Sequence, residues 1–595
     1  MSSILKVDTI QDQAGNNIIN ESSDTITIGA SGDTVNIVGT LQNNGSAVEV
    51  DSVTFKEGGT NFTNSLLVGT DTTGTLSSAD GNTGVGVGVF GALTSGDNNV
   101  AVGLNALDVN TTGSNNTAVG RDSLVFNTTG GDNVAVGSYA SCKNTTGQKN
   151  VSVGFVALGC NTEGANNTAV GFESLLCNTT ADNNTSLGFC SLRLNTTGDQ
   201  NVAVGVVALA ANTTGTENTA VGRFAMNSNT TGANNIAVGK AALCANTTAS
   251  CNTAVGKDAL KATTTGCRNV AVGTGALKTN TTGDKNVAIG REALGVATTA
   301  DGNVAIGFDA AQAQTTAGGN VAVGTNALFS NTTGGASVAI GGNALYAATA
   351  SCGNVAIGHS TGESMTIAKC NTLVGNLAGD ALTTGECVVA IGTAALTTAT
   401  TGIYNNAVGY RSLFSVTTGT CNIGLGKDTG LEITTGYANT AIGHCAMCNT
   451  TTGVNNTAIG YNAQPPAADT YNSFTLGNGD VNNLRCADTS ISSLSDLRDK
   501  TNIEDIPHGL HFINALRPVK FDWNTRDGSR KGKKDYGFIA QELDQVEKDF
   551  NSAEYTRLVS KENPEKWEAD PMKTYPILIK AIQELSEEIE KLKNK

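Results

Sequence analysis

A serine and a lysine that could take part in nucleophilic chemistry lie close together near the C-terminus, in the segment SDLRDK from Ser495 to Lys500. A serine hydroxyl becomes a nucleophile when a neighbouring base accepts its proton, and an uncharged lysine amine can be that base. Spacing alone favours a plainer interpretation, in which Ser495 caps the start of a salt-bridged helix. The acidic neighbours Asp496 and Asp499 also favour the charged form of a nearby amine. The motif therefore needs support from the rest of the chain.

The composition divides the chain near residue 488. All seven prolines lie at or after Pro465, and both tryptophans lie beyond it. Residues 488–595 hold 21 acidic and 18 basic side chains, whereas the much longer stretch of residues 1–487 holds only 31 and 18. A low-charge array therefore precedes an ordinary charged domain.

Charge and hydropathy exclude several classes of protein. The net charge of −16 argues against nucleic-acid binding, which needs a cationic surface. No apolar stretch approaches the roughly 20 residues of a transmembrane helix, so we expect no membrane insertion. The N-terminal sequence MSSILKVDTIQDQAGNNI lacks the basic start and apolar run of a secretory signal. We therefore expect synthesis in a cytoplasm.

A 17-residue repeat dominates the array. The phrase Asn-x-Ala-Val-Gly recurs so that its closing glycine falls at Gly86 and at every seventeenth position up to Gly460, which makes 23 phase glycines. An asparagine lies four residues before each of them except where Ser337 or Val388 replaces it. A large apolar residue such as Leu107 usually follows four residues later, and then Asn-Thr-Thr-Gly. This period is too short for two packed helices and suits short strands joined by turns.

The repeat predicts a mainly β fold, a parallel β-solenoid resembling a β-roll, with an α+β domain after it. The phase glycines supply a positive φ at corners, and stacked asparagines and threonines form ladders between turns. Stacking at about 4.8 Å per turn predicts a rod on the order of 105 Å long. A single turn cannot fold alone, because fixing its backbone costs more free energy than its few buried side chains return.

Side-chain alternation predicts which residues fill the coil. We expect the Val or Ile before each phase glycine to point inward with the later leucine. The intervening alanine, such as Ala118 or Ala135, then points outward. Because that residue is uniformly small, we expect another chain to pack closely against it.

Residues 65–480 resemble the repeats in the heads of trimeric autotransporter adhesins, whose phrase is close to NVAIG at Asn303–Gly307. The period here is longer, and we expect neither the signal peptide nor the membrane anchor of those adhesins. The resemblance implies a parallel homotrimer. Residues 1–64, with short alternating strands such as TITIGASGDTVNIVGTLQ, look like the proximal end of phage structural fibres. We place attachment to other virion tail or baseplate proteins there.

Other signals in the array are weak. Gly86, Gly88 and Gly91 match GxGxxG but lack the strand-turn-helix context of a dinucleotide site, so we expect no cofactor. The 14 cysteines are interpreted as small buried apolar filler rather than disulfide or metal ligands. His359 and His444 are isolated, and we expect no metal.

The last hundred residues carry the second resemblance. Ser-Asp-x-Arg-x-Lys-x-Asn-Ile, Gly-Leu-x-x-Ile-x-x-Leu-x-Pro-Val and Gly-Phe-Ile-Ala-Gln-Glu occur in this order and resemble the endosialidase-type intramolecular chaperone autoprocessing domain, over residues 495–595. The resemblance implies a serine-lysine dyad with Ser495 as nucleophile and Lys500 as base. It also implies that the chain is cut once, between Leu494 and Ser495, at the end of a linker of residues 481–494.

The C-terminal segment predicts a short coiled coil over residues 575–593. Apolar residues occupy its two seam positions in a heptad pattern, at Tyr575, Ile582 and Ile589 and at Leu578, Leu585 and Leu592. This pattern alone leans towards a dimer, whereas the family implies a trimer. Identical repeats leave three chains free to slip by one turn, so a terminal domain that associates first can set their register.

We therefore expect a trimeric tail fibre or similar virion appendage, made in the host cytoplasm, that serves structure and host adhesion. Its C-terminal domain would align three copies and then remove itself, a single-turnover serine autoproteolysis. The expected external partner is a host-cell receptor or glycan, and residues 461–487 are the candidate contact. A bacterial trimeric surface adhesin and a glycan-degrading tail spike remain the alternatives.

Overall fold

The structure is a computed structural model. It describes residues 61–69, 73–481, 495–525, 531–561, 564–565 and 567–595, and the backbone alone in residues 9–11, 17–22, 25–28, 48–50 and 53–57. The chain forms two compact units, residues 1–201 and residues 202–595. Both contain turns of a parallel β-solenoid with a 17-residue repeat, so the predicted mainly β fold is confirmed.

In the first unit, antiparallel strands precede the solenoid. β1 pairs with β2 and β2 with β3, and a second antiparallel set, β4-β5-β6, leads into the first turn. From β6 to β13 each strand pairs in parallel with the next. The strands of this unit are β1 (Thr9–Gln11), β2 (Asn17–Ser22), β3 (Thr25–Ile28), β4 (Val48–Val50), β5 (Val53–Glu57), β6 (Leu66–Val68), β7 (Thr83–Val85), β8 (Val100–Val102), β9 (Thr117–Val119), β10 (Val134–Val136), β11 (Val151–Val153), β12 (Thr168–Val170) and β13 (Thr185–Leu187).

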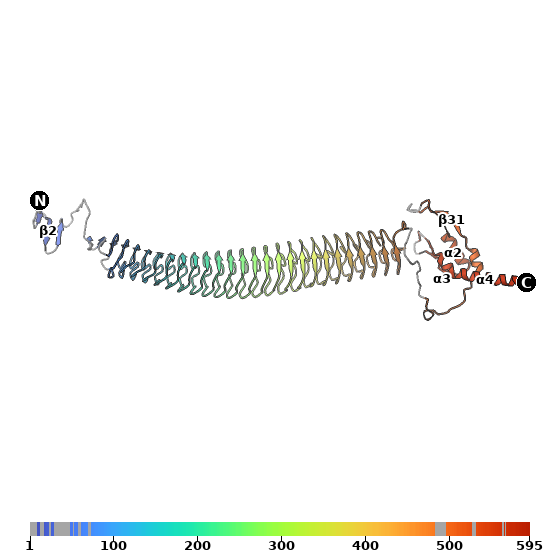
Figure 1. Cartoon of the computed structure of the whole chain (residues 1–595), viewed down its shortest axis with the longest axis horizontal. Coiled ribbons are helices and arrows are strands. Elements are labelled where there is room, and N and C mark those ends of the chain that lie inside the picture. The colour runs from blue at the N-terminus through green and yellow to red at the C-terminus, as the bar shows by residue number, and fades with distance from the viewer. Residues whose placement is uncertain are drawn as a thin grey trace. The chain divides into compact units, whose positions relative to one another are not determined.

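The second unit continues the same pattern. Its strands stack as short parallel arrows in Figure 1, and each residue pairs with the residue one repeat later, as Val287 with Val304. The strands are β14 (Val202–Val204), β15 (Thr219–Val221), β16 (Ile236–Val238), β17 (Thr253–Val255), β18 (Val270–Val272), β19 (Val287–Ile289), β20 (Val304–Ile306), β21 (Val321–Val323), β22 (Val338–Ile340), β23 (Val355–Ile357), β24 (Thr372–Val374), β25 (Val389–Ile391), β26 (Asn406–Val408), β27 (Ile423–Leu425), β28 (Thr440–Ile442), β29 (Thr457–Ile459) and β30 (Phe474–Leu476).

The strand side chains alternate in the opposite sense to our prediction. The middle alanine, such as Ala118 or Ala135, is fully buried inside the coil, whereas Val136, just before the glycine, is 36% exposed. Leu124, four residues after its phase glycine, is buried as predicted. Because the leucine fills most of the interior of so short a turn, only a small residue fits opposite it. The predicted contact of the alanines with another chain is therefore wrong.

The phase glycines adopt the predicted positive φ. At Gly154 the φ angle is 137°, and a β-carbon there would lie 2.4 Å from the carbonyl oxygen of Gly171 in the next turn. Other positions of each turn are left-handed without being glycine, as Leu158 (φ 55°) and Asn166 (φ 58°) are. Such residues cost about 1–3 kcal/mol each, so a turn depends on its neighbours for stability.

Buried asparagines link successive turns, as predicted. The Asn116 side chain donates to Asn99 Oδ1 (3.1 Å) and to the carbonyl oxygen of Gly130 (2.9 Å). A second asparagine ladder begins the Asn-Thr-Thr-Gly segments. Threonines add to it, since Thr111 Oγ1 donates to the carbonyl oxygen of Thr128 (3.0 Å). These ladders satisfy polar groups that would otherwise be costly to bury.

Residues 495–595 contain a small α+β region. Its elements are η1 (Leu497–Asp499), α1 (Leu510–Ala515), β31 (Val519–Asp522), β32 (Lys534–Gly537), α2 (Ala540–Asp549), α3 (Ala553–Thr556), β33 (Val559–Ser560), β34 (Glu568–Ala569), η2 (Pro571–Thr574) and α4 (Tyr575–Lys593). Phe512, Leu543, Leu558 and Ile577 form its core and join α1, α2 and α4. The region therefore has its own small core.

Candidate functional site

Ser495 and Lys500 lie together in the structure. Lys500 Nζ donates a hydrogen bond to Ser495 Oγ over 2.6 Å. Between them the single 3-10 turn η1 folds the chain back, which brings the lysine towards the serine. Both residues are exposed. The two groups that the sequence predicted as nucleophile and base are therefore within proton-transfer distance.

Asp496 caps this turn. Its carboxylate accepts a hydrogen bond from the backbone N–H of Arg498 (2.9 Å) and pairs with Arg498 Nη2 (2.5 Å). The Arg498 hydrogen bonds hold the pKa of the Asp496 carboxyl below its usual value. The plainer interpretation therefore holds in part: the turn is capped and salt-bridged, but Asp496 rather than Ser495 is the cap. One of the two carboxylates expected to favour a charged lysine pairs with arginine instead.

Leu494 lies outside the described residues, as does the rest of the chain between residues 482 and 494. The described part of the site therefore contains the predicted nucleophile and base but only one side of the predicted cleavage bond. Of the candidate receptor contact at residues 461–487, the structure describes residues 461–481.

Helix α4 presents a row of apolar side chains to solvent. Its other face is buried in the domain through Ile577 and Ala581. The exposed row comprises all six predicted heptad positions: Tyr575, Leu578, Ile582, Leu585, Ile589 and Leu592. An apolar row of this length is typical of a helix that packs against another helix. The coiled coil itself stays a prediction.

The solenoid exposes a second apolar surface, which we call the strand face: the first and third residues of strands β7 to β30. The third residue is Val, Ile or Leu in every one of these strands. Val102, Ile289 and Ile357 are typical, with exposed fractions of 36–38%. Both compact units carry this face. Sequence reasoning missed it because it assigned these side chains to the interior.

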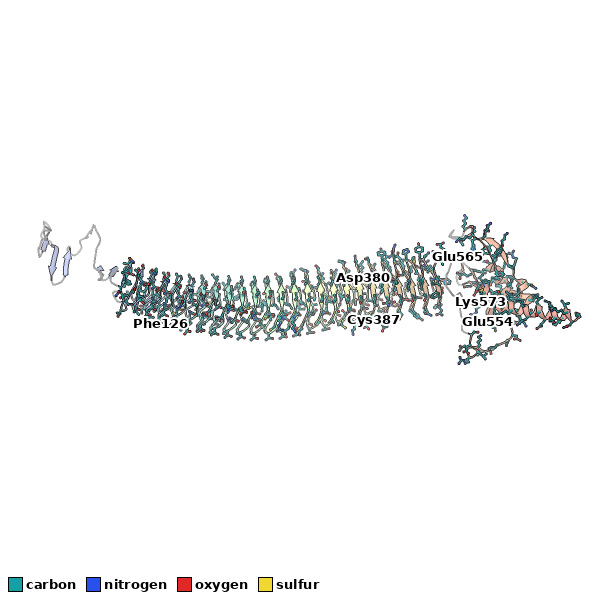
Figure 2. The ribbon with its side chains drawn as sticks, in the orientation of Figure 1. Phe126, Asp380, Cys387, Glu554, Glu565 and Lys573 are labelled. Atoms are coloured by element: carbon teal, nitrogen blue, oxygen red, sulfur yellow. A yellow bond between two sulfur atoms is a disulfide. The ribbon has the colours of Figure 1, made fainter. Side chains whose placement is uncertain are left out.

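The cysteines differ from the prediction of buried filler. The described free thiols lie at turn positions near the surface, where each is partly or fully exposed: Cys142, Cys160, Cys177, Cys190, Cys244, Cys251, Cys267, Cys352, Cys370, Cys387 and Cys421. Figure 2 labels Cys387, and in the first unit the exposed Phe126, among the side chains of the solenoid. Burial raises the pKa of the partly covered Cys142 and Cys177 thiols.

One disulfide joins Cys445 to Cys448. Sequence reasoning missed it, although the segment Cys445-Ala-Met-Cys448 shows a Cys-x-x-Cys spacing that could have identified it. The disulfide cross-links a single turn of the second unit. The Gln464 side chain in the following turn donates to the Cys445 carbonyl oxygen over 2.6 Å.

No cluster of three or more His, Cys, Asp or Glu residues suited to a metal ion occurs in the described part of the chain. The GxGxxG match at Gly86, Gly88 and Gly91 lies in the turn between β7 and β8 rather than at the start of a helix. His508 and His511 pack against the Phe550 ring, with centroid distances of 5.7 and 5.3 Å. Among the described helices, none is long and apolar enough to cross a membrane.

Comparison with known proteins places one part of the chain. No curated protein and no solved structure is significantly similar to the chain. The segment that begins at the Ser495–Lys500 pair is different: residues 495–553 match the sequence model of a peptidase family described as the chaperone of endosialidase.

Proposed function

We propose that this protein is a homotrimeric fibre of a virion, used for host adhesion, whose C-terminal domain aligns three copies and then cuts itself off before Ser495. The strand face carries the proposal. A row of aliphatic side chains that recurs in every turn is more apolar surface than a monomeric protein usually exposes. Covering each half-exposed Val or Ile would contribute about 1 kcal/mol, repeated along many turns.

The match to a chaperone family supports the proposed role of the C-terminal domain in aligning the copies, with the solenoid forming the fibre. The strand face is nearly the same in successive turns, so copies displaced by one turn would keep almost all their contacts. The C-terminal region is not repetitive and exposes its own apolar row on α4. If it associates first, the register of the solenoids follows from it.

The Ser495–Lys500 contact supports the self-cleavage step. In its uncharged form, Lys500 accepts the Ser495 Oγ proton while Oγ attacks the carbonyl carbon of residue 494. The C–N bond breaks, the amine of Ser495 takes the proton, and an ester remains. Water then hydrolyses the ester to a carboxylate and the free serine hydroxyl. Separation of the domain leaves the fibre kinetically stable, because the part that assembled it is gone.

The test is a denaturing gel of the purified full-length protein. Wild type should yield two fragments divided before Ser495, and Ser495→Ala should stay whole while still assembling. Ser560→Ala changes another exposed serine of the same region and should be cut normally. An uncut wild-type chain that has already assembled would refute the self-cleavage step.

A further inference from the structure

Four side chains in one row of the second unit combine aromatic rings with positive charge. Tyr410, Lys427, His444 and Tyr461 each follow the phase glycine in consecutive turns, after strands β26 to β29. We call these four residues the corner row. Their exposed fractions run from 42% for the His444 side chain to 65% for Tyr461. They are therefore accessible to a ligand from solvent.

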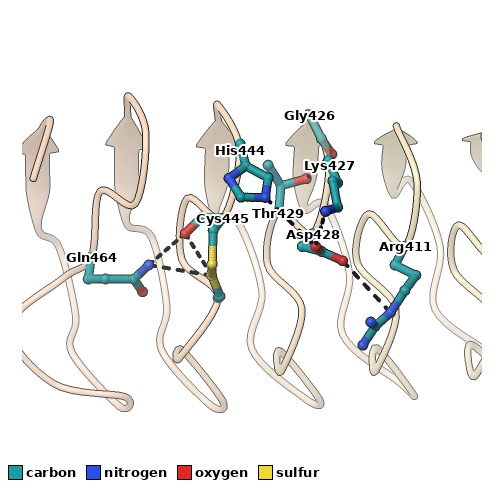
Figure 3. Close-up of polar contacts among 9 residues, drawn as sticks. Arg411, Gly426, Lys427, Asp428, Thr429, His444, Cys445 and Gln464 are labelled. Carbon is teal, nitrogen blue, oxygen red and sulfur yellow. Dashed lines mark hydrogen bonds and ion pairs between the residues drawn. A yellow bond between two sulfur atoms is a disulfide. The ribbon is translucent and has the colours of Figure 1, made fainter.

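Asp428 lies beside the corner row and is mostly buried, with 16% of its side chain exposed. Figure 3 shows the cationic side chains of Arg411 and Lys427 and the His444 ring around it. Arg411 Nε is 3.8 Å from Oδ1, whereas Lys427 Nζ and His444 Nε2 are 3.7 and 3.9 Å from Oδ2. These distances are longer than those of hydrogen bonds. The N–H groups of the three side chains can therefore donate hydrogen bonds to a ligand instead of to Asp428.

The positive charge of this site stands out from its surroundings. Residues 301–481 contain nine acidic and three basic side chains, and two of the three basic ones are Arg411 and Lys427. With a neutral His444, Arg411 and Lys427 exceed Asp428 by one positive charge. A negatively charged ligand would therefore be attracted to this site rather than to other parts of residues 301–481.

Several contacts hold the site in place. The His444 and Tyr461 rings are stacked with centroids 5.4 Å apart and planes 19° apart. The Arg411 guanidinium lies over the Phe414 ring at 5.1 Å. The Cys445–Cys448 disulfide cross-links the backbone directly after His444. Side chains fixed before binding lose less conformational entropy when a ligand arrives.

We propose that the corner row binds a carboxylate-bearing polysaccharide of a host surface. The tyrosine and histidine rings offer apolar surface with polar groups at their edges, which suits the mixed surface of a sugar. Lys427 and Arg411 donate charge-assisted hydrogen bonds to the carboxylates. Successive turns about 4.8 Å apart present these groups in a line, as a linear polymer requires. This inference rests on the proposed host adhesion and names its ligand class.

Binding of the full-length protein to immobilised polygalacturonate tests the proposal, with dextran as the neutral polymer. Wild type should bind polygalacturonate and not dextran, and added salt should weaken the binding. Lys427→Gln and Tyr461→Ala should each lower the affinity about tenfold, the loss expected for one charge-assisted or stacking contact.

The chain supplies matched controls. Lys257 also follows a phase glycine, in a Gly-Lys-Asp segment like that of Lys427, and is exposed. Phe308 occupies the position equivalent to Tyr461 and is 43% exposed. Lys257→Gln and Phe308→Ala should leave the affinity within about twofold of wild type.

Equal losses of affinity in the test and control variants would overturn the proposal, because binding would then reflect net charge or non-specific adsorption. Binding to dextran as strong as to polygalacturonate, or no binding to either, would also overturn it. Light scattering on the same samples reports assembly separately. A Lys427→Gln variant that no longer assembles would identify the corner row as a contact between chains instead. If wild type assembles but does not bind, the polysaccharide site alone fails.

Discussion

Single residues in this protein are constrained mainly by the turn above or below them. The phase glycines show this most clearly, because their backbone conformation and the neighbouring carbonyl both exclude a side chain. At Gly341 the φ angle is 129°, and a β-carbon would lie 2.3 Å from the carbonyl oxygen of Gly358. The adjacent Gly342 has no such restriction, since its β-carbon would meet no atom closer than His359 Cδ2 at 3.4 Å.

We therefore expect Gly341→Ala to destabilise its turn by about 1–3 kcal/mol, the cost of a strained backbone position. Gly342→Ala should change the stability little. Hydrogen exchange of the peptides that cover β22 and β23 measures this locally, which matters because long repeat arrays need not unfold in one step. Equal exchange rates in the two variants would contradict the role assigned to the phase glycine.

An ion pair predicts how the C-terminal region responds to acid. Asp544 is 8% exposed, and hydrogen bonds from Lys548 and Lys561 lower the pKa of its carboxyl. Because the pKa of the Asp544 carboxyl is lower in the folded state, its ionised form stabilises the region at pH values above the unfolded-state pKa of about 4. This stability is lost as the pH falls through the folded-state pKa. Asp544→Asn should cost about 1–3 kcal/mol at pH 7.

Tryptophan fluorescence can follow this region alone, because both tryptophans of the chain, Trp523 and Trp567, lie in it. Between pH 5 and pH 3 the denaturation midpoint of Asp544→Asn should fall less than that of wild type. Asp549→Asn, an exposed position on the same helix, is the control and should behave like wild type. Parallel pH curves for wild type and Asp544→Asn would rule out the ion pair as the cause.

Most solenoid turns hold a large apolar side chain in their interior, and two positions can supply it. Most turns use the leucine four residues after the phase glycine and place Asn or another residue at the seventh. Where the fourth residue is Gly362, Gly379 or Gly430, the seventh is a large apolar residue and is fully buried. Those residues are Met365, Leu382 and Ile433. In these three turns the two positions compensate in volume, and glycine also relieves a left-handed backbone position.

A double-mutant cycle at Gly430 and Ile433 tests this compensation. Ile433→Asn alone should cost about 2–5 kcal/mol because it leaves a cavity. Gly430→Leu alone should cost about 1–3 kcal/mol because its β-carbon would lie 2.7 Å from Leu413 and 2.9 Å from Ile433. The double variant has the pattern of the common turn and should cost less than the sum. Additive costs, measured by hydrogen exchange across β27 to β29, would exclude the compensation.

The sequence predicted the repeat well because its signals are local. A glycine every seventeenth residue and an asparagine four residues before it specify the turn length, the corners and the ladders. The orientation of the strands could not be derived in the same way. In a Val-Ala-Val segment both faces are apolar, so alternation allows either residue inside. The choice depends on the space left by the leucine, which only the closed turn defines.

The candidate site was predictable to a different extent. Ser495 and Lys500 were found through resemblance, and spacing alone had favoured a helix cap. Their 2.6 Å contact depends on the 3-10 turn between them, which the sequence did not reveal. Of the corner row, only Tyr461 lies in the predicted contact of residues 461–487. Tyr410 was missed, because it lies three repeats earlier and joins the same row only when the turns stack.

At the scale of the whole molecule, the proposed association of copies depends on the strand face. Carboxylates placed in three successive turns at Val238, Val255 and Val272 would be buried without partners in an assembled fibre. Such burial costs several kcal/mol per charge. We therefore expect a variant with aspartate at all three positions to dissociate, or to lose its heat resistance. Light scattering coupled to gel filtration should report three chains for wild type and one for this variant.

The control adds the same three charges to the same three turns on another surface. Thr248, Thr265 and Thr282 are exposed threonines outside the strand face. Their replacement by aspartate creates the same repulsion between neighbouring turns, so it corrects for that cost. This control should remain a trimer. If both variants stay assembled, the strand face is not the contact between chains. If both dissociate, charge repulsion within each chain explains the result, and the exposed aliphatic rows need another partner.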